Sequence, residues 1–203
     1  MMQSKAWLKE HNDDPFVKRA IKEGWRSRAV YKLEELDKKY NLIHQGMNIV
    51  DLGAAPGGWS QYVAKKVGKT GKLIAIDVLD MDSINNVHFL KGDFTEQDIY
   101  ESLSELVGQK SIDLVLSDMA PNISGINSVD QPKAMYLAEL AAEFSVEVLA
   151  SDGGLIVKLF QGAGFDDYVK MLRSKFSKVL IRKPEASRPR SREMYALATH
   201  IKL

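Results

Sequence analysis

A glycine-rich turn between a largely apolar run and an amphipathic segment constrains this chain more than any other feature. The turn covers residues 51–60 and reads DLGAAPGGWS, between residues 47–50 and the helically spaced residues 59–67. A carboxylate at a strand end, glycines that let the backbone approach a ligand and a helix start together form a small-molecule cradle. The turn matches neither the dinucleotide-binding G-x-G-x-x-G pattern nor the P-loop G-x-x-x-x-G-K-[ST], which argues against both chemistries.

Short apolar segments alternate with helical patterns along the rest of the chain. We predict strands at 48–52, 72–77, 87–91, 112–117, 155–160, 178–182 and 193–199. We predict helices at 15–22, 27–40 with Ser27 as N-cap, 59–67, 96–107, 130–150 and 165–174. This alternation predicts an α/β fold with a mostly parallel seven-stranded sheet and helices on both faces. A polar loop at 183–192, in place of a helix, predicts a final antiparallel hairpin at one edge.

Composition sets limits on the class of protein. The 203 residues suit a single domain, and 45% of them are hydrophobic. We expect one domain over 1–203 with a basic helical extension over about 1–41. There is no run of 18 apolar residues, and residues 1–10 are polar, so we expect neither a membrane span nor a signal peptide. The absence of cysteine excludes disulfides and thiolate chemistry. Together with the lack of a membrane span and of a signal peptide, it leads us to expect a cytoplasmic location, which the absence of cysteine alone would not imply.

Charge is distributed unevenly along the chain. Residues 1–41 carry 10 Lys/Arg and 7 Asp/Glu, residues 42–169 carry 8 and 18, and residues 170–203 carry 10 and 2. If the two basic ends meet, they form a cationic face suited to RNA phosphates; the alternative is a scatter of solvated side chains. The candidate RNA contacts are Lys18, Arg19, Lys22, Arg26 and Arg28 near the N-terminus, and Arg182, Lys183, Arg188, Arg190 and Arg192 around the last hairpin.

Acidic residues fall at the ends of three successive predicted strands, where open α/β sheets bind ligands. Asp51 ends the first strand beside Gly53. Asp77 lies about 20 residues after the turn, the spacing of an acid that accepts from ribose hydroxyls. Asp93 follows the third strand and could accept from the exocyclic amine of adenine. Each acid taken alone would more readily be a helix cap or turn residue, but three in register favour a nucleoside pocket.

A lysine inside an apolar strand marks a second cluster. Lys158 lies in the run 155–160 and needs a partner if it is buried. Asp118, after the preceding strand, is the obvious one. Glu193 at the start of the last strand and Lys32 on the second N-terminal helix complete a set of two lysines and two acids. The alternatives are a catalytic group and a structural network of buried ion pairs.

These motifs resemble those of one family. The turn resembles motif I of S-adenosylmethionine-dependent methyltransferases, and nearly the whole chain is similar to the FtsJ-type RNA 2′-O-methyltransferases. The resemblance rests on a Trp7…His11…Phe16-Val17…Ala20 pattern and on the segments RSRAVYKLEE, DLGAAPGGWSQY, SDMAPNISG, VKLFQGAGFD, RKPEASR and SREMY. It implies a Rossmann-like methyltransferase fold, S-adenosylmethionine bound by Gly57, Trp59, Asp77, Asp93 and Asp118, and a catalytic tetrad of Lys32, Asp118, Lys158 and Glu193.

The resemblance also implies a reaction. A ribose 2′-hydroxyl is a weak acid, and Lys158 could remove its proton in the neutral form or stabilise the developing oxyanion in the charged form. The expected substrate is a uridine in the A-loop of 23S rRNA within the 50S ribosomal subunit, modified by a monomer. The alternatives are a tRNA ribose methyltransferase and a non-catalytic ribosome-assembly factor that binds RNA. No metal is expected, because none of the four histidines has ligand spacing to another.

Overall fold

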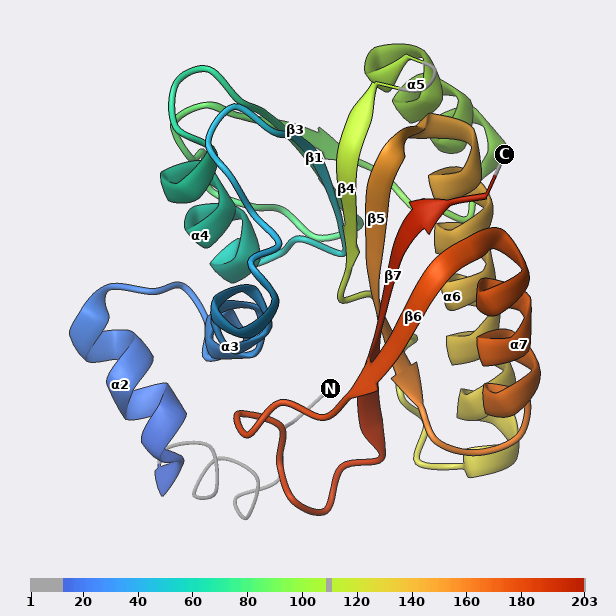
Figure 1. The fold of residues 1–203 in the computed structure, drawn as a ribbon. Helices are drawn as coiled ribbons and strands as arrows, with labels where there is room; N and C mark the ends of the chain where they lie inside the picture. Colours follow the sequence, from blue (N-terminus) through green and yellow to red (C-terminus); the bar gives the residue numbers. More distant parts are fainter. Residues whose placement is uncertain (1–12, 109–110, 203) are drawn as a thin grey trace.

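A twisted seven-stranded sheet forms the centre of the computed structural model, which describes residues 13–108 and 111–202 (Figure 1). Its strands are β1 (Asn48–Leu52), β2 (Lys72–Asp77), β3 (Val87–Lys91), β4 (Ile112–Ser117), β5 (Leu149–Phe160), β6 (Phe176–Arg182) and β7 (Glu193–Ile201). The order across the sheet is β3-β2-β1-β4-β5-β7-β6. Neighbours from β3 to β5 are parallel, and β7 is antiparallel to both β5 and β6. The predicted sheet and its final antiparallel hairpin are therefore confirmed.

Helices cover both faces of this sheet. The helices are α2 (Pro15–Glu23), α3 (Val30–Tyr40), α4 (Gly58–Val67), α5 (Gln97–Val107), α6 (Asn127–Val148) and α7 (Phe165–Lys175). Figure 1 shows α3 and α4 on one side and α6 and α7 on the other, with α2 outside α3. The family-pattern residues Trp7 and His11 and the polar start over 1–10 lie outside the described residues. Within the described part of the chain, no helix is both long and apolar enough to cross a bilayer.

Two hydrophobic cores form because successive strand residues point to opposite faces. Ile49 and Leu73 pack toward α3 and α4, where they meet Leu33 and Val63. Val50 and Ile74, the next residues along these two strands, point to the opposite face and pack against α5 and α6. Val115 of β4 joins them there. Burial on both faces explains why β1, β2 and β4 read as continuous apolar runs.

The helices predicted at 27–40 and 130–150 have different bounds in the structure. Ser27 does not cap α3, which begins at Val30 with Ala29 at the cap and no side-chain capping bond. The segment before α3 is held by contacts with α4, where the Trp59 indole N–H donates to Ala29 O at 2.8 Å. Ser27 packs against the start of α4, since a Cβ at Gly58 would lie 2.5 Å from the Ser27 hydroxyl oxygen.

The helix predicted at 130–150 is α6, which begins earlier, at Asn127, and ends at Val148. Leu149 already belongs to β5 and pairs with Ile112. The apolar residues at this junction suit a buried helix end and a buried strand equally, so periodicity could not separate the two. The strand predicted at 155–160 therefore starts earlier, at Leu149, and its pairing with β4 has a register shift between Ile112 and Leu114.

Candidate active site

The predicted site residues meet at the carboxyl ends of the parallel strands. Asp51 lies near the end of β1, Asp77 ends β2, and Asp118 directly follows β4. Strand order reverses between β1 and β4, because β2 and β3 lie on one side of β1 and all later strands on the other. Ligands of open α/β sheets bind outside such a switch point. The fold therefore places the glycine-rich turn and the acidic residues where a ligand is expected.

The glycine-rich turn requires glycine at two positions. Gly53 has φ +78°, and an added Cβ would lie 2.8 Å from Met119 Cγ and 2.9 Å from the Met119 backbone. Gly57 has φ +104°, and its Cβ would lie 2.9 Å from a guanidinium nitrogen of Arg26 and from the sulfur of Met81. Any other residue would be strained in this conformation and would fill the cradle.

The carboxylates of Asp77 and Asp93 order the loops around the turn. Asp77 accepts from Ala55 N at 2.9 Å and from Leu79 N at 2.8 Å, which ties the turn to the loop after β2. Asp93 is exposed and accepts from the backbone N–H and hydroxyl of Thr95 at 2.9 and 2.8 Å. A carboxylate offers about four acceptor sites, so both acids keep capacity for a ligand.

Trp59 lies at the first turn of α4 with its side chain in the core. It is 3% exposed, and its ring centroid is 5.8 Å from that of Tyr195. Its indole N–H donates to the backbone carbonyl of Ala29. The Trp59 side chain therefore supports the site from beneath, between α3 and β7.

Arg26, expected among the RNA contacts, connects the N-terminal helices to the turn. Its guanidinium donates to the carbonyls of Asp82 at 2.6 Å, Ser83 at 2.9 Å and Pro56 at 3.4 Å. Its backbone N–H donates to Gln61 Oε1 at 2.8 Å. A planar fork with several donors suits such bridging, which a lysine could not reproduce. Arg26 therefore holds the β2–β3 loop over Gly57.

Arg26→Ala is expected to loosen the β2–β3 loop. Hydrogen bonds to a charged group contribute about 1.5–3 kcal/mol each, so amide exchange in residues 79–86 should accelerate by about tenfold or more. Hydrogen exchange with mass spectrometry would measure this, with Arg19→Ala as the matched control, since Arg19 pairs on the surface with Glu23. Equal exchange of the loop in both variants would contradict the bridging role.

Asp51 is fully buried beneath the turn and has one unpaired oxygen. Its Oδ2 accepts from the Ser60 hydroxyl at 2.6 Å, and its Oδ1 has no partner among the described residues. Burial, which outweighs the Ser60 hydrogen bond and is reinforced by the charges of Asp118 and Asp77, raises the pKa of Asp51 to about 7. Oδ1 of Asp51 is therefore available to accept from a donor, or to pair with a cation, that binds at the turn.

This raised pKa predicts a pH dependence of stability. From about pH 4 to 7 the unfolded chain has released the Asp51 proton while the folded chain retains it, so unfolding free energy falls as pH rises. At about 1.4 kcal/mol per pKa unit, the loss is on the order of 4 kcal/mol at most. Asp51→Asn should remove this component and flatten the profile. Denaturant unfolding between pH 4 and 8 measures it, and parallel profiles for parent and variant would refute the assignment.

The four residues of the predicted tetrad come together as two ion pairs. Lys158 Nζ lies 3.0 Å from Asp118 Oδ1, and Lys32 Nζ lies 2.7 Å from Glu193 Oε1. The side chains of Lys158 and Asp118 are 8% and 19% exposed. Lys158 also donates to the Asp118 backbone carbonyl, and the Ser187 hydroxyl donates to Glu193 at 2.9 Å. The site is therefore nearly neutral and only partly open to water.

Sheet register explains how residues distant in sequence meet. Across the antiparallel β5–β7 pair, Lys158 faces Tyr195 and Phe160 faces Glu193. Register partners share a face, and residues two apart on one strand also share it. Lys158 and Glu193 therefore project toward the α3 side, where Lys32 reaches them. Asp118 joins from the neighbouring strand end of β4.

Tyr195 belongs to the cluster, although it was not among the predicted site residues. Its hydroxyl donates to Asp118 Oδ1 at 2.7 Å and accepts from Lys32 Nζ at 3.4 Å, which joins the two ion pairs. Burial, with the charge of Asp118, raises the pKa of Tyr195 well above its usual value, so the hydroxyl keeps its proton. Its position two residues beyond Glu193 on a predicted strand was the available signal.

The lysines also fix the charge of Asp118. Burial alone would raise the pKa of this carboxyl, but the nearby charges of Lys158 and Lys32 and the Tyr195 hydrogen bond hold it below its usual range. Asp118 is therefore ionised at neutral pH. It can hold Lys158 in place through its carboxylate and its carbonyl.

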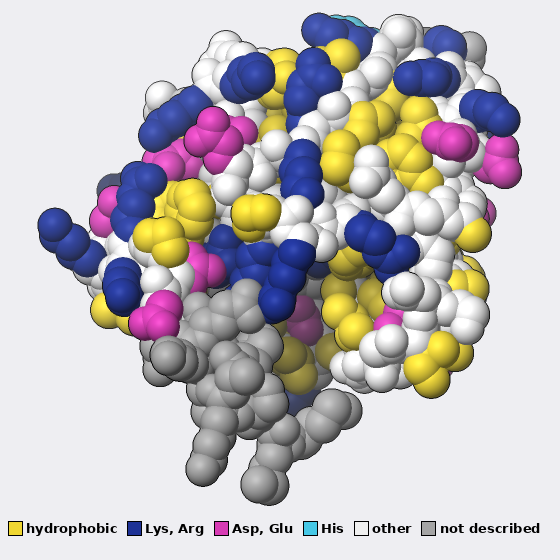
Figure 2. All heavy atoms as spheres, turned by 90° about the horizontal axis from the view of Figure 1, so that it is seen from below, with side chains coloured by type: hydrophobic (Ala, Val, Ile, Leu, Met, Phe, Trp, Pro, Cys, Tyr) yellow, Lys and Arg dark blue, Asp and Glu magenta, His cyan; other side chains and the backbone are white. Residues whose placement is uncertain are grey.

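The two basic segments lie side by side, as expected, and several of their cations make internal contacts. Arg28 is mostly buried between Asp14 and the Ala186 carbonyl. Arg19 pairs with Glu23 and stacks on Tyr31, and Arg182 donates to Tyr40. The exposed basic residues at this end of the molecule include Lys18, Lys22, Lys183, Arg190 and Arg192. Arg188 is half-buried. Figure 2, seen from below, shows Lys and Arg side chains across the middle of this face.

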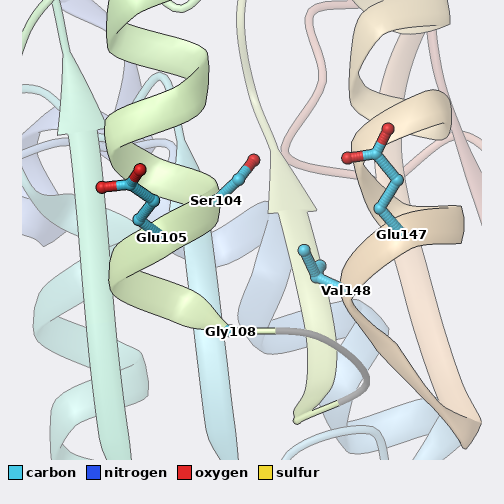
Figure 3. A pocket seen from close by; sticks show the side chains of 5 residues that line it. All are labelled: Ser104, Glu105, Gly108, Glu147 and Val148. Carbon is cyan, nitrogen blue, oxygen red and sulfur yellow. The ribbon is translucent and has the colours of Figure 1, made fainter.

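A cavity of about 510 Å³ lies away from this chemistry. Ser104, Glu105 and Gly108 of the α5 end and Glu147 and Val148 of the α6 end line it (Figure 3). This is the opposite end of the sheet from the tetrad, and none of the described residues that line the cavity is basic. The described residues contain no group of three or more His, Cys, Asp or Glu side chains arranged to hold a metal ion.

A seven-stranded sheet with this order, a glycine-rich turn after β1 and a polar cluster at the strand ends define a methyltransferase-type α/β enzyme. The FtsJ-like methyltransferase family model matches residues 25–201. Two proteins named ribosomal RNA large subunit methyltransferase E, from Legionella pneumophila strains Corby and Paris, are 55% identical over 195 residues, covering 96% of this chain and 95% of theirs. The chain belongs to the FtsJ-like methyltransferase family.

Solved structures agree with this assignment. A crystal structure described as a ribosomal RNA methyltransferase from Plasmodium falciparum matches with a TM-score of 0.77 and 31% identity, covering 87% of this chain and 98% of that one. A structure described as an rRNA methylase from Clostridium thermocellum matches with a TM-score of 0.56 and 16% identity, which supports the fold alone.

Proposed function

We propose that this chain transfers the methyl group of S-adenosylmethionine to the ribose 2′-oxygen of a uridine in the A-loop of 23S rRNA, within the 50S ribosomal subunit. The observation that carries the proposal is the pair of ion pairs, Lys158–Asp118 and Lys32–Glu193, joined through Tyr195 beside the glycine-rich turn. We further propose that it acts as a cytoplasmic monomer and that residues 1–203 form one domain with an N-terminal basic extension.

The residues at the turn fit S-adenosylmethionine. Gly53 and Gly57 leave a cradle that a Cβ would fill, and the unpaired Oδ1 of Asp51 lies beneath it. Asp77 would accept from the ribose hydroxyls, Asp93 from the adenine amine, and Asp118 would lie beside the reacting end. When bound, the cofactor supplies an electrophilic methyl group on a sulfonium centre.

The tetrad acts on the acceptor hydroxyl. A ribose hydroxyl holds its proton strongly at neutral pH, so it needs a partner that takes the proton or stabilises the oxyanion. Lys158 is the group for this step, because Asp118 fixes its ammonium through two oxygens. Lys32, held by Glu193, provides a second cation that orients the hydroxyl and the neighbouring phosphate. Holding the reacting groups in line supplies much of the rate through proximity.

The name of the Legionella relatives supports a large-subunit rRNA substrate over tRNA. The exposed basic side chains around α2 and the β6–β7 loop would contact phosphates, which position RNA without reading its sequence. A non-catalytic assembly factor would not need two lysines and two acids in register, and membership of a methyltransferase family argues against it.

Transfer of tritium from methyl-labelled S-adenosylmethionine tests the proposal. Undermethylated 50S subunits and unmodified tRNA would be incubated separately with the protein. We expect label in 23S rRNA of the 50S subunits and none in tRNA. Label in tRNA would favour the tRNA reading, and label in neither would favour the assembly factor.

A further inference from the structure

A small cavity of about 120 Å³ opens beside the tetrad. Three of the segments that line it also carry tetrad residues. Pro121 and Ile123 follow Asp118 on the loop after β4, Phe160 lies two residues after Lys158 on β5, and Arg192 directly precedes Glu193 on β7. The cavity therefore adjoins the site along three separate segments.

Strand geometry gives the spacing between the cavity and the catalytic lysine. Phe160 and Lys158 share a face of β5, and two residues along a strand cover about 6.6 Å. This is a short step, of the order that separates a ribose from its own base. The cavity lies at the carboxyl ends of β4 and β5, between the loop after β4, the start of α6 and Arg192, and the glycine-rich turn does not line it.

The cavity wall is held by hydrogen bonds. The Gln131 amide donates to the carbonyls of Phe160 at 2.9 Å and Ala163 at 3.0 Å. Asp130 accepts from Ser124 N at 2.9 Å and from Gly125 N at 2.9 Å, which closes the loop into α6. Gln131 Oε1 is buried and has no hydrogen-bond partner among the described residues.

The cavity combines an apolar surface with hydrogen-bond donors. Ile123 is 62% exposed at its mouth. Arg192 donates to Asn127 Oδ1 at 2.8 Å, which fixes both side chains at the rim. A guanidinium has five N–H donors and an amide has two, so further donors of Arg192 and of Asn127 remain for a ligand. Such a site suits a flat ring that carries carbonyl oxygens.

We propose that this cavity receives the unstacked base of the target nucleotide and that Arg192, supported by Asn127, selects uracil over cytosine. The inference rests on the proposed function, because it needs an RNA ribose at Lys158. Single-stranded RNA is commonly read by splayed bases that stack on side chains and hydrogen-bond through their edges. The O4 of uracil accepts a hydrogen bond from a guanidinium. Cytosine has an amine at the same position, and because the amine and the guanidinium are both donors, they cannot form this hydrogen bond.

The test compares two substrates across matched variants. Single-turnover methylation rates would be measured on 50S subunits whose 23S rRNA carries uridine or cytidine at the mapped target position. We expect the parent to prefer uridine by about tenfold to a hundredfold, the discrimination typical of a good side-chain contact with a base edge. Arg192→Gln should lower this preference by about tenfold, and Arg192→Glu should raise the cytidine rate, because a carboxylate accepts from the cytosine amine.

Arg190→Gln is the matched control, since it removes the same charge from an exposed neighbouring position. It should slow methylation of both substrates equally and leave their ratio unchanged. A parent that methylates both substrates equally, or a ratio unchanged in both Arg192 variants, would overturn the inference while leaving the proposed function intact. If the parent labels neither 50S substrate, the proposed function itself fails.

Discussion

Replacing Lys158 with alanine is expected to slow methyl transfer by about 10²–10⁴-fold, the usual contribution of a positioned acid–base group. Binding of S-adenosylmethionine should remain nearly normal, because the Lys158 side chain is directed at Asp118 and the acceptor site. Single-turnover kinetics with 50S subunits give the rate, and calorimetry gives the affinity. A near-normal rate in the variant would remove Lys158 from the chemistry.

Two further lysine variants sharpen this result. Lys158→Arg keeps the positive charge but cannot lose its proton at neutral pH, so it distinguishes proton removal from charge stabilisation. If Lys158 is the base, the arginine variant should be as slow as the alanine variant; if its charge suffices, much of the rate should return. Lys170→Ala is the matched control, because Lys170 lies exposed on α7 in a surface pair with Asp167.

Replacing Asp77 with alanine is expected to weaken S-adenosylmethionine binding by about 10- to 150-fold, which corresponds to about 1.5–3 kcal/mol for lost charge-assisted hydrogen bonds. The variant loses the ribose acceptor and also frees Ala55 and Leu79, which the Asp77 carboxylate holds. Isothermal calorimetry would measure the change in dissociation constant.

Asp80→Ala is the appropriate control for Asp77. Asp80 lies on the same loop, but its side chain is 85% exposed and pairs with Lys91 on the surface. The loss of one negative charge near the site is therefore the same in both variants. If the two variants weaken binding equally, the effect comes from general electrostatics and Asp77 makes no direct contact.

The sheet could be predicted from the sequence because each strand is a short apolar run bounded by turn residues. Four strands, β1 to β4, have the predicted bounds, and the tetrad pairing of Lys158 with Asp118 followed from adjacent motifs. The helix ends were less predictable. Ser27 has the right chemistry for a cap, but contacts with α4 determine where α3 begins.

Side-chain contacts between segments that are distant in sequence could not be predicted from local patterns. Arg26 and Arg28 read as free cations in sequence, yet one bridges the β2–β3 loop and the other lies between Asp14 and Ala186. The sequence indicates that Tyr195 shares a face of the last strand with Glu193, but its register opposite Lys158 follows only from the folded sheet. The unpaired oxygen of Asp51 depends on burial beneath a turn that only the folded chain creates.

If the tetrad directs methyl transfer to a ribose oxygen, as we propose, the position of the methyl group is the most direct test. After reaction with 50S subunits, 23S rRNA would be digested to nucleosides and analysed by mass spectrometry, with alkaline hydrolysis to locate the resistant linkage. We predict 2′-O-methyluridine with the parent and its loss with Lys158→Ala. A methyl group on a base, or 2′-O-methyluridine formed equally well by the variant, would contradict the account.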